Sequence, residues 1–178
     1  DFDDICVSLK SSSVPITMRA CQLMAQESDY PLHIGVTEAG TVRMGTLKSA
    51  VGIGGLLALG VGDTMRVSLS ADPVEEVYAA RDILKAAGVR KEGPELVSCP
   101  TCGRTKINLI ALANEVEERL KSVDKPITVA VMGCAVNGPG EAAAADCGIA
   151  GGIGEGLLFQ KGEIVKKVPQ DRLVDELF

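Results

Sequence analysis

The sequence predicts two folded parts in tandem, an α/β part followed by a smaller α+β part. Three times in the first half, a short run rich in β-branched and apolar residues precedes a longer run with helical apolar spacing. Glycine and proline next to charged residues at 91–94 then interrupt this rhythm and mark a domain boundary. Beyond the boundary, strands and helices follow one another less regularly. We therefore expect one domain over residues 1–93 and a second over residues 94–178.

Length and composition fit a chain with a hydrophobic core. The 178 residues are 46% hydrophobic and 24% charged, which argues against disorder. The net charge of -6 repels a phosphodiester backbone, so nucleic acid is not expected as a partner. No run approaches the roughly 20 apolar residues of a membrane helix, so no membrane partner is expected either. The cysteine usage favours a reducing, cytoplasmic compartment over a secreted disulfide framework.

The first domain is predicted from three strand–helix pairs. The strands are expected at residues 5–9, 32–37 and 64–69. The first two helices are expected at 16–25 and 46–59, and a third begins at Pro73 with Asp72 as its cap. Successive βα units with nearly continuous apolar strands are typical of a parallel sheet covered by helices.

The second domain is predicted to mix strands and helices without a repeat. The expected elements are a strand at 96–97, a helix at about 107–123, a strand at 127–131, a hairpin at 156–168 and a terminal helix at 170–177. The helix face expected to be buried carries Ile107, Ile110, Ala111, Asn114 and Leu120. The glycine-rich run 148–156 is expected to form tight turns between strands.

Three cysteines and a glutamate form the strongest chemical pattern of the chain. Cys99 and Cys102 enclose two residues, and Cys134 follows 32 residues later after a strand-like run. Glu141 lies seven residues beyond Cys134, across an Asn-Gly-Pro-Gly sequence that must turn sharply. Two thiolates so close can bind one metal centre from a single loop, and a third can close on them from another element. The pattern therefore predicts a metal site.

Spacing alone leaves three interpretations of this pattern. An iron–sulfur cluster accommodates a cysteine pair and a distant single cysteine, with Glu141 as a harder and more exchangeable fourth ligand. A zinc-stabilised binding module would need four closed ligands, and Cys147 could complete the tetrahedron. A thiol–disulfide oxidoreductase would use Cys99-Pro-Thr-Cys102 before a helix, whose N-terminus stabilises the first thiolate. This last interpretation leaves Cys134 and Glu141 without a role.

Several motifs resemble the 4-hydroxy-3-methylbut-2-enyl diphosphate synthase family of the methylerythritol phosphate route to isoprenoids. The cysteines lie in the runs SCPTCGR at 98–104 and GCAVNGPGEA at 133–142. Further family-like motifs are VTEAG at 36–40, KSA at 48–50, and GDTMRVSL at 62–69 followed by Asp72-Pro73. The resemblance therefore covers most of the chain.

The resemblance also implies an architecture. The family consists of a TIM-type barrel followed by a small iron–sulfur α+β domain. Because a whole barrel needs about 250 residues, residues 1–93 are expected to be its last three βα units. The first five units would then be absent from this chain. The family's enzymes are homodimers, so a homodimer is expected at full length.

The resemblance implies the chemistry of the second domain. Cys99, Cys102 and Cys134 would be thiolate ligands of a 4Fe-4S cluster, with Glu141 on the fourth iron. The implied reaction is the two-electron reductive ring opening and dehydration of 2-C-methyl-D-erythritol 2,4-cyclodiphosphate to 4-hydroxy-3-methylbut-2-enyl diphosphate. Flavodoxin or ferredoxin would supply the electrons. Displacement of Glu141 by a substrate oxygen would make that iron available as a Lewis acid, and Asn137 is close enough in sequence to contact this oxygen.

The first domain would bind the diphosphate. Lys10, Arg66 and Ser68 are near the carboxyl ends of predicted strands, where barrel active sites are built, and these side chains suit phosphate oxygens. Glu38 would be the acidic group beside the substrate carbons, as a proton donor or a charge stabiliser. The alternative for Glu38 is a cap of the next helix. Arg104, just beyond the cysteine pair, either eases the charge of a cluster or lies in solvent.

Overall fold

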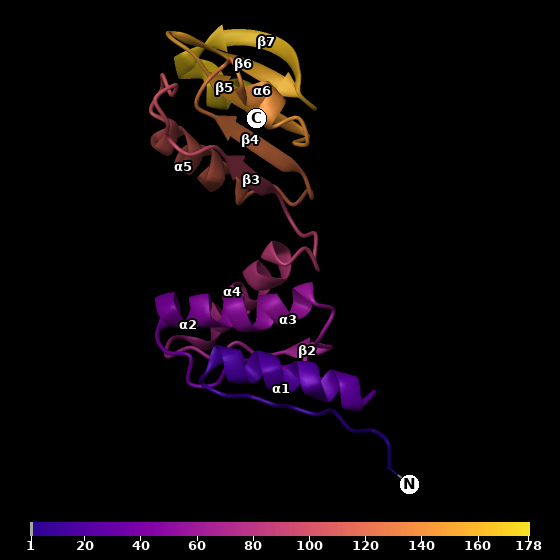
Figure 1. The fold of residues 1–178 in the computed structure, drawn as a ribbon. Coiled ribbons are helices and arrows are strands. Elements are labelled where there is room, and N and C mark those ends of the chain that lie inside the picture. Colours follow the sequence, from indigo (N-terminus) through magenta and orange to yellow (C-terminus); the bar gives the residue numbers. More distant parts are fainter. Residues whose placement is uncertain (1) are drawn as a thin grey trace. The chain divides into compact units, whose positions relative to one another are not determined.

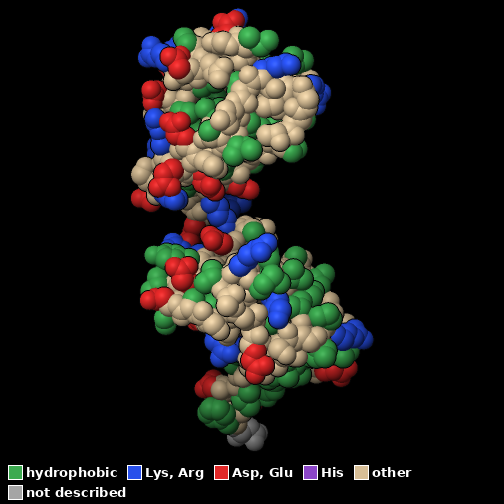
Figure 2. Space-filling view, turned by 90° about the vertical axis from the view of Figure 1, so that its left-hand side faces the viewer, with side chains coloured by type: hydrophobic (Ala, Val, Ile, Leu, Met, Phe, Trp, Pro, Cys, Tyr) green, Lys and Arg blue, Asp and Glu red, His purple; other side chains and the backbone are tan. Residues whose placement is uncertain are grey.

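A computed structural model describes residues 2–178 and shows two compact units, the first ending at Lys91 and the second beginning at Glu92 (Figure 1). Each unit has its own sheet and its own hydrophobic core. Within the described residues, no helix has the length and apolarity needed to cross a membrane. On the face of these residues shown in Figure 2, acidic and basic side chains are interspersed rather than gathered into one basic patch.

The strands of the first unit are parallel, as predicted. β1 (His33–Ile34) pairs with β2 (Thr64–Met65), and a single bridge joins Val7 to Leu32 in the same sense. The predicted strand at 5–9 is therefore reduced to one bridge, in which the Val7 N–H donates to the Pro31 carbonyl and the His33 N–H donates to the Val7 carbonyl.

The other two predicted strands are also shorter as regular ladders, although the pairing continues beyond them. The Arg66 N–H donates to the Ile34 carbonyl at 3.0 Å, and the Thr37 N–H donates to the Ser11 carbonyl at 3.2 Å. The extended backbones thus stay side by side up to the points where the candidate substrate residues occur.

The helices of the first unit are α1 (Val14–Glu27), α2 (Val42–Ser49), the π-helix η1 (Ala50–Gly54), α3 (Gly55–Ala58) and α4 (Pro73–Ala86). The prediction of a helix starting at Thr46 is wrong by four residues, because Thr41 already has the extended backbone of an N-cap residue. The Asp72 cap is confirmed, since its carboxylate accepts the Val74 N–H at 2.9 Å.

One face of the first unit's strands packs against the helices. This core consists of Cys21, Leu32, Ile34, Ile53, Leu56, Val67, Ala79 and Ile83. Because side chains alternate along a strand, residues at the intervening positions, such as Lys10, His33 and Arg66, lie on the opposite face. That opposite face carries the polar groups discussed below.

The second unit contains a five-stranded mixed sheet in the order β3-β4-β5-β6-β7. The strands are β3 (Glu95–Ser98), β4 (Thr128–Met132), β5 (Cys147–Gly151), β6 (Glu155–Gln160) and β7 (Glu163–Pro169). β3, β4 and β5 run parallel to one another, whereas the β5–β6 and β6–β7 pairs are antiparallel. The β6–β7 hairpin and its turn at Lys161-Gly162 are confirmed, with both turn residues at positive φ.

The prediction of turns throughout 148–156 is wrong, because this run contains β5 in the middle of the sheet. A Cβ atom at Gly148 would lie 2.5 Å from Cζ of Phe159 and 2.6 Å from the carbonyl oxygen of Ala130. Glycine is thus used here for close packing inside a strand rather than for a turn.

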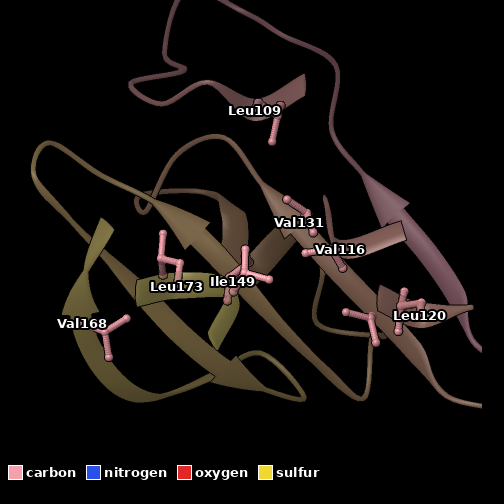
Figure 3. Close-up of a cluster of buried hydrophobic side chains, with 9 residues drawn as sticks. Leu109, Val116, Leu120, Val131, Ile149, Val168 and Leu173 are labelled. Atoms are coloured by element: carbon pink, nitrogen blue, oxygen red, sulfur yellow. The ribbon is translucent and has the colours of Figure 1, made fainter. Parts of the chain in front are cut away.

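The helices of the second unit are α5 (Leu109–Leu120), α6 (Gly138–Glu141), the 3-10 turn η2 (Gln170–Arg172) and α7 (Leu173–Leu177). The predicted face is confirmed for Leu120 and for Ile107, which lies before α5 and packs against the core, but it is wrong for Ile110, Ala111 and Asn114, which are exposed. Ile110 is 63% exposed, whereas Leu109, Val116 and Leu120 are buried in the core shown in Figure 3. The helix starts at Leu109 because the Asn108 side chain caps it by accepting the Ala111 N–H.

Candidate functional site

Cys99 and Cys134 lie at the same edge of the second unit's sheet. Ser98 is opposite Val131 in the parallel register of β3 and β4, so both cysteines follow the carboxyl ends of neighbouring strands. The Gly133 N–H donates to Cys99 Sγ at 3.2 Å. Two residues that are 35 positions apart in the sequence are thereby joined through one hydrogen bond and one peptide unit.

Cys102 lies in a loop that is tied to the same edge. Its N–H donates to Thr105 Oγ1 at 3.2 Å, and the Lys106 N–H donates to the Gly133 carbonyl at 3.3 Å. The pKa of the Cys102 thiol is lowered, first by the backbone N–H of Arg104 and then by hydrogen bonds from the Arg104 and Thr105 side chains. A lowered pKa favours the thiolate, which is the form that binds metals.

Glu141 returns toward these thiols through the single turn of α6. The Gly138 N–H donates to the Cys134 carbonyl at 3.1 Å, and the Glu141 N–H donates to the Asn137 carbonyl at 2.8 Å. The Asn137 amide also donates to Glu141 Oε1 at 3.4 Å, and Arg104 Nη2 lies 3.8 Å from the same oxygen. The predicted sharp turn is therefore a short helix that brings the carboxylate beside the cysteine loop.

Two glycines let these loops approach one another. A Cβ atom at Gly133 would lie 2.8 Å from Thr105 Oγ1, and one at Gly138 would lie 2.7 Å from the Met132 Cβ. Both distances are too short for a real side chain. The edge of the sheet can therefore carry both loops only with glycine at these positions.

The types of donor at this sheet edge are those that an iron–sulfur cluster can use. Among residues 2–178, no three Cys, His, Asp or Glu side chains converge closely enough to hold one ion. In a cubane cluster each ligand binds a different iron, so the ligands are spread over a larger object. The structure supplies three thiols on two neighbouring loops with a carboxylate beside them.

Cys147 is badly placed to be a fourth zinc ligand. It begins β5 opposite Val129, whereas Cys134 lies beyond Met132, whose partner is Ala150. At about 3.3 Å per residue, Cys147 is on the order of 15 Å along the sheet from the level of Cys134. Burial raises the pKa of the Cys147 thiol, in keeping with its packing against the core.

The thiol–disulfide exchange interpretation requires a helix that starts at the cysteine pair, and the structure has a loop there. α5 begins at Leu109, seven residues after Cys102, and the intervening chain is a loop. Neither Cys99 nor Cys102 is therefore at a helix N-terminus, and the expected dipole stabilisation of a reactive thiolate is missing from both.

Lys10, Arg66 and Ser68 come together on the polar face of the first unit. Arg66 Nε donates to Ser68 Oγ at 3.1 Å. A Cβ atom at Gly35 would lie 2.9 Å from Lys10 Cε and 2.5 Å from the Arg66 carbonyl oxygen. The Lys10 side chain therefore passes over Gly35, just beyond β1, because glycine leaves room for it there. The pKa of Lys10 is lowered by burial and then by repulsion from Arg66, which indicates that the two cations are neighbours.

Sequence reasoning missed three residues on this face. The Ser8 hydroxyl donates to the His33 carbonyl at 3.1 Å, and His33 Nδ1 lies 2.8 Å from Thr64 Oγ1. Burial, Lys10 and Arg66 together lower the pKa of His33. The sequence could have indicated them, because side chains two positions apart on a strand share a face. Ser8, His33 and Thr64 precede Lys10, Gly35 and Arg66, respectively, by two positions.

Glu38 is exposed and has an unusual backbone. Its φ is 51°, a value uncommon for residues other than glycine and often found at functional sites. The alternative that Glu38 caps the next helix is wrong, because Thr41 is the N-cap residue of α2. The described contacts place Glu38 at the carboxyl end of the middle strand, the end at which Lys10 and Arg66 also occur.

Comparisons with known proteins cover both units. Residues 1–81 match the family model of the GcpE TIM-barrel domain, and residues 95–178 match that of the GcpE protein C-terminal domain. The chain belongs to the GcpE family. The TIM-barrel match and the observed parallel βα structure confirm the α/β class of the first part.

Curated relatives of the GcpE chain carry one name, 4-hydroxy-3-methylbut-2-en-1-yl diphosphate synthase (flavodoxin). The chain is 61% identical over 177 residues to the protein of Ruminiclostridium cellulolyticum, covering 99% of this chain and 50% of the relative. Identity is 62% over 177 residues to that of Clostridium acetobutylicum, covering 99% and 51%. It is 63% over 176 residues to that of Geobacter sulfurreducens, covering 99% and 50%. The chain thus spans about half the length of the curated relatives it matches.

Proposed function

We propose that this chain is the cluster-binding and partial barrel portion of a 4-hydroxy-3-methylbut-2-en-1-yl diphosphate synthase. The observation that carries the proposal is the arrangement of Cys99, Cys102, Cys134 and Glu141 on two touching loops at one sheet edge. The names of the relatives, a diphosphate synthase that uses flavodoxin, support a redox reaction at this site.

In the second unit, the three cysteines would hold three irons of a 4Fe-4S cluster and Glu141 the fourth. When bound, the cluster supplies one-electron transfer and a Lewis-acidic iron. The protein's own part is to present thiolates and one exchangeable carboxylate. Asn137 donates to that carboxylate and is proposed to contact the substrate oxygen that replaces it.

In the first unit, Lys10, Arg66 and Ser68 would bind the diphosphate of 2-C-methyl-D-erythritol 2,4-cyclodiphosphate. Burial and then repulsion from Arg66 lower the pKa of Lys10, and an anion placed between the two cations relieves this repulsion. The Arg66 guanidinium offers directional donors and Lys10 a point charge. Binding at this face would orient the substrate, and Glu38 would act as proton donor or charge stabiliser beside its carbons.

The remaining parts of the proposal concern the whole protein. Residues 1–93 would be the last three βα units of a TIM-type barrel, with the iron–sulfur domain over residues 94–178. The product would be 4-hydroxy-3-methylbut-2-enyl diphosphate, an isoprenoid precursor. Flavodoxin, named for the relatives, or ferredoxin would donate the two electrons one at a time, and the full-length enzyme would be a homodimer.

Anaerobic reconstitution tests the cluster directly. The chain is incubated with iron and sulfide, desalted, and analysed for iron, acid-labile sulfide, zinc and visible absorption. A brown protein with about four irons per chain is expected for a 4Fe-4S centre. Cys134→Ser should lose this cluster, while the matched variant Cys147→Ser should keep it. Stoichiometric zinc, absence of iron, or cluster loss only in Cys147→Ser would overturn the proposal.

A further inference from the structure

Arg104 joins the two loops that carry the candidate cluster ligands. It lies two residues after Cys102 in the loop that follows β3, and its guanidinium reaches Glu141 in α6, which follows β4. Arg104 Nη2 is 3.8 Å from Glu141 Oε1, and its cation is close enough to Cys102 to lower the pKa of that thiol. The thiol of Cys134 also lies within electrostatic range of this cation. One positive charge therefore faces three of the four proposed ligands.

Stability does not explain this arrangement. The Arg104 and Glu141 side chains are 62% and 49% exposed, and exposed ion pairs contribute little to folding because water screens them. A cation at this place has a larger effect on a bound cluster than on folding. The net charge around an iron–sulfur centre and the hydrogen bonds to its sulfurs set its reduction potential. Arg104 supplies a positive charge beside the proposed ligands.

We propose that Arg104 is a positioning residue that raises the reduction potential of the cluster through its positive charge, which lies beside Glu141 and two residues after Cys102. This inference rests on the proposed function, because it requires a cluster at these ligands. The redox step concerned is uptake of one electron by the cluster from a reduced one-electron donor protein. The donor is oxidised by one electron, and no bond forms or breaks. The added negative charge is stabilised by the fixed positive charge of Arg104.

The test compares three variants of the reconstituted chain by redox titration under anaerobic conditions, with the reduced cluster followed by electron paramagnetic resonance. Arg104→Gln removes both the charge and the forked donor, whereas Arg104→Lys keeps the charge and loses the fork. Lys106→Gln is the matched control. It removes one positive charge from the same loop, and the contact that ties Lys106 to the site is made by its backbone N–H.

The midpoint potential of Arg104→Gln should shift to a more negative value than that of the wild type. Arg104→Lys should lie between the two, and Lys106→Gln should stay near the wild type. Equal potentials for the wild type and Arg104→Gln, at equal iron content, would overturn the inference and leave the proposed function standing. An equal shift in Lys106→Gln would also overturn it, because any cation in the loop would then serve.

Iron content separates the remaining outcomes. If the wild type itself takes up no iron, the proposed function fails and not merely the role of Arg104. If Arg104→Gln assembles no cluster, Arg104→Lys carries the test. A negative shift in that variant supports the inference, and a potential equal to the wild type's contradicts it.

Discussion

Both units place their candidate functional groups at the carboxyl ends of parallel strands, but they hold these groups in different ways. In the first unit, Lys10 and Arg66 are part of the strand segments and share a face by the two-residue alternation of side chains. In the second unit, the donors follow the strands in loops. Those loops are held by backbone contacts such as the hydrogen bond from Gly133 to Cys99. The groups proposed to bind an anion are thus preset by strand geometry, whereas the proposed metal ligands depend on how loops pack.

The largest effect is expected at the candidate metal site of the second unit, whose proposed ligands lie in loops. Glu141→Ala removes the proposed exchangeable ligand and should lower turnover of the full-length enzyme by more than about 100-fold, because even outer partners of metal ligands typically cost 10- to 100-fold. Steady-state assays with a reduced flavodoxin measure the effect. Glu163→Ala, at the start of the exposed strand β7, is the matched control. Unchanged turnover in Glu141→Ala would contradict its role as a ligand.

A smaller effect of substitution is expected at the polar face of the first unit, where Lys10 and Arg66 lie on strand segments. Arg66→Ala removes a charged donor that also orients Ser68, and a hydrogen bond to a charged group is worth about 1.5–3 kcal/mol. We therefore expect kcat/KM for the cyclic diphosphate to fall about 10- to 100-fold, with no change in the iron content of the chain. Arg43→Ala, on the exposed side of α2, should leave kcat/KM unchanged. A loss of iron in Arg66→Ala would mean that the two sites are not independent.

A third change tests how much the second unit depends on glycine. In Gly148→Ala the new methyl group would meet the Phe159 ring and the Ala130 carbonyl at about 2.5 Å. Overpacking of this kind destabilises a protein by about 1–3 kcal/mol. Urea denaturation of the second unit should show this loss. Gly103→Ala is the comparison, since a Cβ atom there meets nothing within 4 Å. Equal stability of the two variants would contradict the tight packing of β5.

The smallest expected effect concerns the first unit. Ser49 is fully buried at the end of α2, and within the described residues its hydroxyl has no hydrogen-bond partner. Because an unpartnered buried hydroxyl is unfavourable, Ser49→Ala should leave stability unchanged or raise it by about 1 kcal/mol. Thermal denaturation measures the change, with the exposed Ser70→Ala as reference. A clear loss of stability in Ser49→Ala would mean that this hydroxyl makes a stabilising contact.

Much of the candidate site was predictable because its signals are local. The spacing of Cys99 and Cys102, the Asp72 cap and the turn at Lys161-Gly162 each depend on residues close in sequence. The carboxyl-end rule for parallel strands then predicted that Lys10 and Arg66 would be neighbours. The structure agrees with that expectation.

The errors concern features set by distant residues. β5 was missed because the partner of Gly148 is Phe159 on another strand, and sequence alone cannot show that a ring fills the space. The buried face of α5 was misassigned because the predicted set included Ile107, which lies before the helix begins at Leu109. The helix residues that enter the core, Leu109, Val116 and Leu120, share a different face by helical spacing. The position of Cys147, far from Cys134 along the sheet, likewise depends on strand register.

Mössbauer spectroscopy of the chain reconstituted with ⁵⁷Fe tests most directly whether three thiolates and one carboxylate hold a cluster. Three irons should give similar signals and one a distinct signal. That distinct signal should change in Glu141→Ala and remain as in the wild type in Glu163→Ala. Four equivalent irons, or a spectrum unaffected by the loss of Glu141, would contradict the assignment of this carboxylate to the exchangeable iron.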